Sequence, residues 1–349
     1  MRRHPERTML KNANGETSSY GNFKNPFGLV WRMLRSGKRA AWSALFREGL
    51  KLIAKPADLM LSPLDVRRGS KASLKEGLPL ILIVGPPRGG TTMVYQILAN
   101  SLDVTCPNNL SSLFPRSSIT MGRWRGKPPS DFGSYFGQTS HLSGVNDGFH
   151  IWNRWLGADR YRTRTDLSNG EILDMRRYFN AWTAAHGKPF LNKNNRNAHC
   201  IKYLSETLPN AYFVVVQRDP AAIARSLIRA RKAIQGDKRI GWGLLCQETH
   251  SEAKSFGYVR DVCEQIQNIN AQIAEQTATV DRNRLIETTY EEFCTDPSQC
   301  ISRLIEQIPQ LSRRGGEDVS EPELFKPSSI CPLSLDEEDI LQQYFRKWS

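Results

Sequence analysis

The sequence predicts an α/β fold with a central parallel β-sheet and helices on both faces. Short apolar runs typical of buried strands alternate along the chain with segments of helical periodicity, which is the pattern of a parallel sheet. The chain has 349 residues, enough to bury such a core. Ligands of open parallel sheets bind at the carboxyl ends of the strands. Candidate functional residues are therefore expected in the loops that directly follow strands.

Residues 1–75 are predicted to form a basic N-terminal arm, and residues 76–349 the catalytic domain. The arm holds 16 Lys and Arg but only 5 Asp and Glu, so it carries +11 of the chain's net charge of +13. The near-neutral remainder shows that the basic character belongs to the arm. Such an arm favours an acidic partner, and an anionic membrane or glycan fits better than nucleic acid.

Within the arm, residues 27–54 are predicted to form an amphipathic helix. Apolar side chains share one face and cations alternate with them. Two interpretations stay open: the helix packs on the domain with its cations in water, or it lies on an anionic membrane surface. Packing is favoured because Gly37 and Gly49 interrupt the apolar stripe.

The first predicted strand, residues 80–84, runs into the glycine-rich loop 85–90. Residues 93–98 then have helical spacing. A strand, glycine-rich loop and helix place backbone N–H groups and a helix N-terminus around a phosphate. This unit predicts a P-loop-like, three-layer version of the α/β fold.

The loop departs from the G-x-x-x-x-G-K-[ST] pattern of nucleotide-triphosphate sites. Gly85, Gly90 and Thr92 match it, but Thr91 stands where the lysine that reaches the β/γ-phosphates belongs. The loop's cation is Arg88. These residues indicate a nucleotide donor without a γ-phosphate.

A second buried strand is predicted at residues 212–217, followed by Arg218. Asp219 is expected to cap the next helix and Pro220 to occupy its first turn. Ser226 lies about two turns into that helix. An arginine at the strand tip and a serine on the helix can hold one phosphate together.

The remaining chain supplies the other layers of the fold. Residues 101–146 are irregular and rich in Ser, Pro, Gly and aromatics, as expected of an acceptor cleft. Helices are expected at 148–155, 171–185, 198–208, 220–233, 245–278 and 297–308, with short strands at 189–193 and 284–289.

These two sites resemble those of sulfotransferases that use 3′-phosphoadenosine 5′-phosphosulfate (PAPS). Residues 87–92 are similar to the family's 5′-phosphosulfate loop, with Gly89 in place of the usual Ser, and Arg218 and Ser226 have the spacing of its 3′-phosphate pair. The resemblance covers residues 78–310. It implies that Gly89, Gly90, Thr91 and Thr92 bind the donor with Arg88, and that Tyr290 packs by the adenine.

The resemblance also implies catalytic roles. Arg88 is the candidate that stabilises the leaving phosphate, because sulfuryl transfer develops charge on its bridging oxygen. Lys193 occupies the place of a catalytic lysine, but Asn195 replaces the histidine that acts as base in cytosolic members. Asparagine cannot take a proton, so the base must lie elsewhere.

Asp147 is the leading candidate for that base, because it stands five residues before Trp152, as a glutamate does in similar bacterial members. His150 and His141 are alternatives, since histidine suits base chemistry near neutral pH. The alternative interpretation is structural: Asp147 caps the N-terminus of the following helix.

The expected activity is transfer of a sulfuryl group from PAPS to a hydroxyl of a carbohydrate or glycolipid, with adenosine 3′,5′-bisphosphate as product.

No metal is expected, because the seven Cys include no CxxC pair and the six His lack zinc spacing. No apolar stretch is long enough to cross a bilayer. The cytoplasm is expected, with peripheral contact at the inner membrane face. A nucleotide-triphosphate-dependent small-molecule kinase and a non-catalytic anion binder are the alternatives.

Overall fold

The computed structural model describes residues 23–73, 77–124, 132–159, 163–244, 256–315 and 333–346. Its centre is a four-stranded sheet in the order β4-β1-β5-β6. All three strand pairings are parallel, as predicted. The strands are β1 (Leu80–Val84), β4 (Phe190–Lys193), β5 (Ala211–Gln217) and β6 (Leu285–Thr289).

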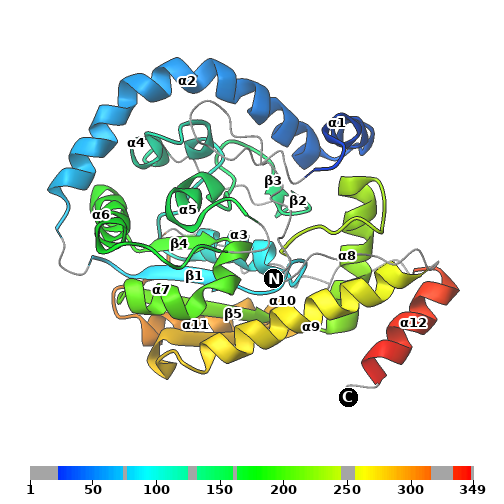
Figure 1. Ribbon diagram of the computed structural model, residues 1–349. Coiled ribbons are helices and arrows are strands. Elements are labelled where there is room, and N and C mark those ends of the chain that lie inside the picture. The colour runs from blue at the N-terminus through cyan, green and yellow to red at the C-terminus, as the bar shows by residue number, and fades with distance from the viewer. Residues whose placement is uncertain are drawn as a thin grey trace, which may run out of the picture.

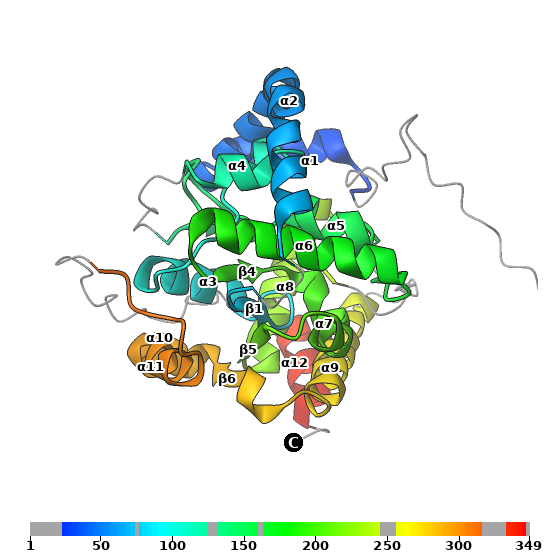
Figure 2. The same cartoon turned by 90° about the vertical axis from the view of Figure 1, so that its left-hand side faces the viewer.

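Helices cover both faces of the sheet, which confirms the predicted layers (Figure 2). Alternate residues of each strand point to opposite faces, so Leu82 and Phe213 enter one core and Ile83 and Val214 the other. The first core contains side chains from α5 (Phe149–Leu156), α6 (Asn169–His186), α7 (Ile201–Thr207) and α9 (Gly257–Thr277). The second contains side chains from α3 (Thr91–Ser101), α10 (Tyr290–Thr295) and α11 (Pro297–Gln307).

A third apolar cluster joins α8 (Pro220–Gln235), α9 and the C-terminal helix α12 (Leu335–Arg346). Helix α8 begins as predicted: the Asp219 carboxylate accepts hydrogen bonds from the backbone N–H groups of Ala221 and Ala222, and Pro220 stands in the first turn. Helices α10 and α12 were not predicted from the sequence.

The region predicted to be irregular, residues 101–146, contains more regular structure than expected. It holds a 3-10 helix (Ser111–Leu113), helix α4 (Ser118–Gly122) and a hairpin of strands β2 (Ser134–Tyr135) and β3 (Gln138–Thr139). Each element is five residues or shorter. Such lengths are too short for the periodicity that identifies helices and strands in a sequence.

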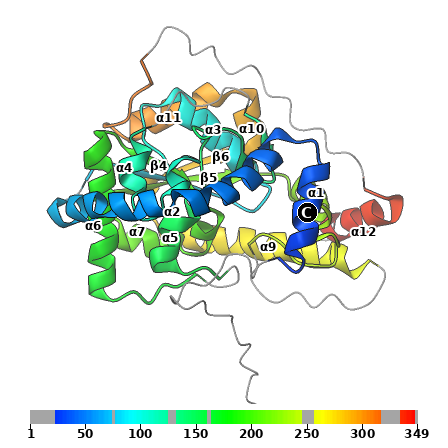
Figure 3. The ribbon, with the colours of Figure 1, turned by 90° about the horizontal axis from the view of Figure 1, so that it is seen from above.

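The N-terminal arm forms α1 (Pro26–Arg35) and the long helix α2 (Arg39–Lys71), which arches over the molecule (Figures 1 and 3). The helix predicted over 27–54 is therefore broken near Gly37, whose φ is +64°, and continues 17 residues beyond its expected end. Pro56 and Pro63 lie inside α2. Each proline removes one i→i−4 hydrogen bond, and such positions bend helices.

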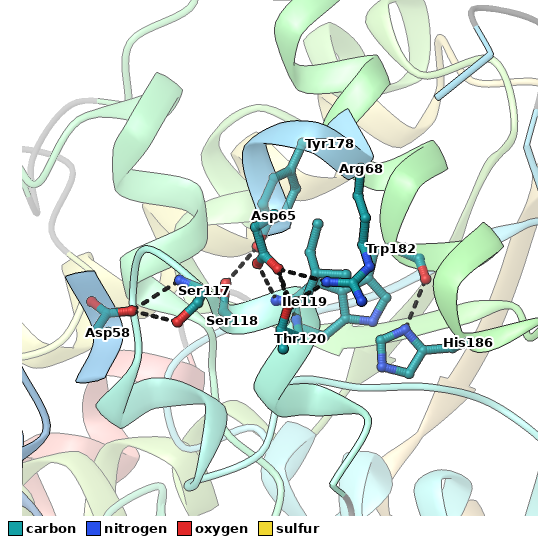
Figure 4. Close-up of polar contacts among 10 residues, drawn as sticks. All are labelled: Asp58, Asp65, Arg68, Ser117, Ser118, Ile119, Thr120, Tyr178, Trp182 and His186. Carbon is teal, nitrogen blue, oxygen red and sulfur yellow. Dashed lines mark hydrogen bonds and ion pairs between the residues drawn. The ribbon is translucent and has the colours of Figure 1, made fainter. Parts of the chain in front are cut away.

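Two carboxylates fasten α2 to the domain (Figure 4). Asp58 accepts hydrogen bonds from the backbone N–H (2.9 Å) and hydroxyl (2.7 Å) of Ser117. Asp65 accepts them from the backbone N–H groups of Ile119 (2.7 Å) and Thr120 (2.9 Å). Both carboxylates are buried. The inner face of α2 is therefore packed on the domain.

Candidate active site

The candidate site lies where the four parallel strands end. Lys193 is the last residue of β4, and the loop 85–90 follows β1 directly. Arg218 follows β5, and Tyr290 follows β6 as the first residue of α10. The parallel register brings these four ends to one edge of the sheet. The carboxyl end of each strand therefore lies at a segment that was predicted from the sequence to be functional.

The loop 85–90 is held close to its neighbours. A Cβ on Gly85 would lie 2.6 Å from the carbonyl oxygen of Val216 on β5. Gly90 has a φ of +89° and is the N-terminal cap of α3. Arg88 has a φ of +69°, an uncommon value for a residue other than glycine. The N–H groups of the first turn of α3, which begins at Thr91, form the predicted anion-binding helix end.

The two arginines predicted to contact phosphate lie together. The Arg88 Nε donates a hydrogen bond to the hydroxyl of Ser226 (2.9 Å), and Nη1 of Arg218 donates to the backbone carbonyl of Arg88 (2.9 Å). The loop, the tip of β5 and helix α8 are thereby joined in one cluster. The sequence motifs containing Arg88, Arg218 and Ser226 thus form one site.

This cluster concentrates positive charge. Burial, and next the charge of Arg218, lower the pKa of Arg88 to about 10. The Arg218 side chain is 6% exposed, and its Nε has no hydrogen-bond partner among the described residues. The carboxylate of Glu291 lies 3.9 Å from that Nε and is itself 46% exposed. Two buried guanidinium groups with one distant carboxylate favour binding of an anion.

Two aromatic rings enclose the arginines. The Tyr290 ring lies 4.2 Å from Cζ of Arg218 and is buried beneath the loop. A Cβ on Gly90 would lie only 2.0 Å from Cδ2 of Tyr290. The Phe136 ring, from the turn of the β2–β3 hairpin, lies 5.2 Å from Cζ of Arg88. Phe136 was not predicted as a site residue, because it comes from a region with no periodic pattern.

Lys193 and Asp147 form a second group. Their side chains make an ion pair of 2.9 Å, with the lysine 3% and the carboxylate 17% exposed. Side-chain amides of Asn192 and Asn194 donate hydrogen bonds to the Asp147 backbone carbonyl. Lys193 pairs in the sheet with Ile83, two residues before the loop. The ion pair therefore lies beside the start of the loop.

The cap of helix α5 is Gly148, with a φ of +67°, and not Asp147. The Asn192 amide oxygen accepts a hydrogen bond of 2.7 Å from the indole N–H of Trp152 on this helix. Asn192 thus links the residues around Asp147 to the core. No role was predicted for Asn192, because a single asparagine in an apolar strand forms no motif.

The two histidine candidates differ in their surroundings. Burial, and then the charges of Arg154 and Lys51, lower the pKa of His150 to about 3. Such an imidazole is neutral near pH 7 but is a weak proton acceptor. His141 lies in an exposed turn with a φ of +63°.

Among the described residues, no cluster of three His, Cys, Asp or Glu side chains could hold a metal ion. Within the same ranges, no helix is both long and apolar enough to cross a membrane.

Comparison with known proteins places this geometry in context. A model described as the sulfotransferase family matches residues 79–309. Protein-tyrosine sulfotransferase 1 of Rattus norvegicus is 23% identical over 188 residues, and that of Homo sapiens is 24% identical over 180. The matches cover 52% and 50% of this chain but only 42% and 40% of the relatives. The matched part is thus less than half of these relatives' length.

A solved structure shows the same fold. Sulfotransferase STF1 from Mycobacterium tuberculosis is similar with a TM-score of 0.50 at 10% sequence identity. The similarity covers 91% of this chain and 85% of that chain.

Proposed function

Because the chain belongs to the sulfotransferase family, we propose that it moves a sulfuryl group from PAPS to an acceptor hydroxyl. The acceptor that we propose is a carbohydrate or glycolipid. The reaction forms a bond between the acceptor oxygen and sulfur and breaks the bond from sulfur to the phosphate oxygen. The acceptor's proton leaves with a base, and adenosine 3′,5′-bisphosphate is the second product.

The observation that carries this proposal is the half-buried cluster of Arg88, Arg218 and Ser226. Arg88 belongs to the loop yet reaches Ser226 on α8, so one side chain connects the two proposed phosphate sites. We assign Arg218 and Ser226 to the 3′-phosphate. A donor with two separate anionic groups matches this arrangement better than a single phosphate chain would.

The loop is assigned to the 5′-phosphosulfate. Backbone N–H groups of Gly89 and Gly90, with the backbone and hydroxyls of Thr91 and Thr92, would bind its oxygens. Arg88 adds the positive charge that stabilises the leaving phosphate. The Tyr290 ring lies against Arg218 and beside Gly90 of the loop, and adenine is proposed to pack near it.

Asp147 is proposed as the base and Lys193 as the cation that orients it. As a carboxylate, Asp147 can accept the proton of the acceptor hydroxyl. The ion pair with Lys193 holds the Asp147 carboxylate oxygens in position. His150 remains the alternative base. Its lowered pKa, about 3, makes it the weaker choice.

Calorimetry on the full chain tests the donor. We expect micromolar binding of adenosine 3′,5′-bisphosphate and much weaker binding of 5′-AMP, which lacks the 3′-phosphate. Arg218→Ala should weaken bisphosphate binding by at least about tenfold, whereas Arg239→Ala should not, because Arg239 is an exposed side chain paired with Asp237. Equal affinities for the two nucleotides would refute the assignment of the 3′-phosphate site.

The same titrations separate the alternatives. Preference for ATP with Mg²⁺ would support a kinase, although Thr91 in place of the P-loop lysine opposes it. Bisphosphate binding without turnover on any acceptor would support a non-catalytic binder. Acceptors should be screened with labelled PAPS against sugars, glycolipids and tyrosine peptides, since the curated relatives are named as protein-tyrosine sulfotransferases. Exclusive labelling of peptides would overturn the proposed acceptor class.

A further inference from the structure

From Arg47 onward, helix α2 has the reverse of the usual distribution of polar and apolar residues, whereas Ala40, Ala41 and Ala44 pack in an apolar cluster with α1. The buried face that contacts the domain includes Arg47 and the hydrogen-bonded carboxylates of Asp58 and Asp65. The opposite face exposes large apolar side chains, with Phe46 67%, Ile53 75% and Met60 82% exposed. The apolar face therefore cannot be explained by packing against the domain.

Part of the exposed apolar surface of α2 forms one stripe, whereas the exposed Leu52, Leu59 and Val66 lie outside it. Positions 42, 46, 49, 53, 56, 60 and 63 alternate in steps of four and three, which keeps them on one side of a helix. We define the α2 stripe as the large apolar side chains on these positions, Trp42, Phe46, Ile53 and Met60. Helix α1 adds Phe27 and Trp31, which are 88% and 59% exposed.

Positive charge flanks the stripe at both ends. Exposed Lys38 and Arg39 precede it, and exposed Arg67 and Lys71 follow it. Residues 26–71 hold ten Lys and Arg against three Asp and Glu. Two of those three acids are Asp58 and Asp65, which are buried on the inner face. The outward charge of the helix is therefore strongly positive.

We infer that the α2 stripe docks this protein on the surface of an anionic lipid bilayer. Apolar side chains enter the boundary between headgroups and acyl chains, and flanking cations contact anionic headgroups. A nucleic acid or soluble glycan would attract the cations but gain nothing from Ile53 or Met60. A second copy of this face would bring like charges together. The bilayer is the partner that satisfies both features.

Figure 3 shows α2 crossing the top of the described chain with no other labelled element above it. Figure 1 shows α2 as an arch, and the middle of this helix is the part that lies farthest from the sheet. The side chain of Arg47 on the inner face donates a hydrogen bond to Gln138 (2.9 Å) in β3. The same hairpin carries Phe136, which lies against Arg88. Docking would therefore place the membrane on the side of the molecule where this hairpin covers the candidate site.

Vesicle sedimentation with the full chain tests this inference. We expect binding to vesicles of phosphatidylcholine with phosphatidylglycerol, weak binding to phosphatidylcholine alone, and a decrease with added salt. The triple variant Phe46→Gln, Ile53→Gln and Met60→Gln should bind at least about tenfold more weakly. Its melting temperature should be unchanged, because all three side chains are exposed. The matched control is Leu335→Gln, an 86% exposed leucine on α12.

Several outcomes would overturn the inference. They are no binding to anionic vesicles, equal binding by the triple variant, or equal binding to neutral vesicles. Light scattering that shows a dimer lost in the triple variant would assign the stripe to a second copy instead. Substituting glutamine for the cations at 38, 39, 67 and 71 should remove the salt-sensitive part of binding. Vesicle binding needs no nucleotide, so these results do not depend on the proposed function.

Discussion

Gly90 shows how tightly single residues are constrained at this site. Its φ of +89° lies in the region that favours glycine, and a Cβ there would overlap the Tyr290 ring, at 2.0 Å from Cδ2. Gly137, at the hairpin turn, has a similar φ of +95°, but the nearest atom to its Cβ would be 3.8 Å away. The two glycines therefore share the conformational constraint and differ in the steric one.

We expect Gly90→Ala to lower the free energy of unfolding by about 3 kcal/mol or more, because strain and overlap combine. Gly137→Ala should cost only about 1 kcal/mol, from the conformation alone. Denaturant unfolding of both variants measures the difference. Equal losses would show that the Tyr290 ring moves aside freely and does not fix the loop.

Asp147→Asn tests the proposed base. The amide keeps the shape of the side chain but accepts no proton, so turnover should fall at least about a hundredfold. Bisphosphate affinity should stay within about twofold. The matched control is Asp103→Asn, which removes another Lys–Asp pair, with Lys188 just before the start of β4, at the opposite end of this strand from Lys193. Near-normal turnover in Asp147→Asn, combined with loss in His150→Gln, would move the base to His150.

At the scale of elements, the buried carboxylates of Asp58 and Asp65 are part of the polar attachment of α2, together with Arg47 and Arg68. Asp58 accepts from the N–H and hydroxyl of Ser117 and from the N–H of Arg116. Asp58→Ala should lower the free energy of unfolding by about 1–3 kcal/mol, because buried donors lose their acceptor. Glu48→Ala, on the exposed surface of the same helix, should change it by less than about 0.5 kcal/mol. Urea denaturation compares them, and similar small losses would mean that the Asp58 hydrogen bonds contribute little to the attachment of α2.

Helix α12 provides a pH-dependent attachment through Glu337. Burial alone would raise the pKa of this carboxyl, but hydrogen bonds from Lys238, Tyr258 and Ser334 outweigh burial and lower the pKa to about 2. The ordinary value is 4.5, so the folded state binds its proton less readily than the unfolded state does. The stabilising contribution is complete above about pH 4.5 and is lost as the pH falls toward 2.

Glu337→Gln should therefore destabilise the protein by about 2 kcal/mol at pH 7, and the difference from the original chain should shrink below about pH 4.5. Melting temperatures of both proteins between pH 3 and pH 7 measure this convergence. Asp336→Asn, on the neighbouring exposed position, is the control. A constant difference across the range would show that the ionised form of Glu337 is not the stabilising one.

For the whole molecule, the proposed donor should act as a stabilising ligand. A ligand that binds only the folded state at a hundred times its Kd adds about 2.7 kcal/mol. Adenosine 3′,5′-bisphosphate should therefore raise the melting temperature, and above its Kd the increase should follow the logarithm of its concentration. Hydrogen exchange should slow at the loop 85–90 and the start of α8, where the proposed contacts lie. No shift at saturating concentration would contradict the nucleotide site.

Most of the sheet was predictable, because its strands are apolar runs. Two of them are followed by segments with a known motif, the glycine-rich loop 85–90 and the helix start at 218–220. The 80–84 and 212–217 strands and the cap at Asp219 follow from local sequence, and the structure confirms them. Phe136 and Asn192 could not be identified in this way. Their positions depend on packing between distant segments, which leaves no period or motif in the sequence.

The position of Tyr290 beneath the loop 85–90 also has a consequence for biosynthesis. Gly90 leaves the ribosome long before Tyr290, and β1 needs both β4 and β5 as neighbours in the sheet. Because a domain generally folds as a unit, and the N-terminal segments are made first, this loop lacks the Tyr290 ring beside it until β6 and the first residue of α10 have been synthesised. A nascent chain that stops short of residue 290 would carry the whole glycine-rich motif and still lack the ring that supports it.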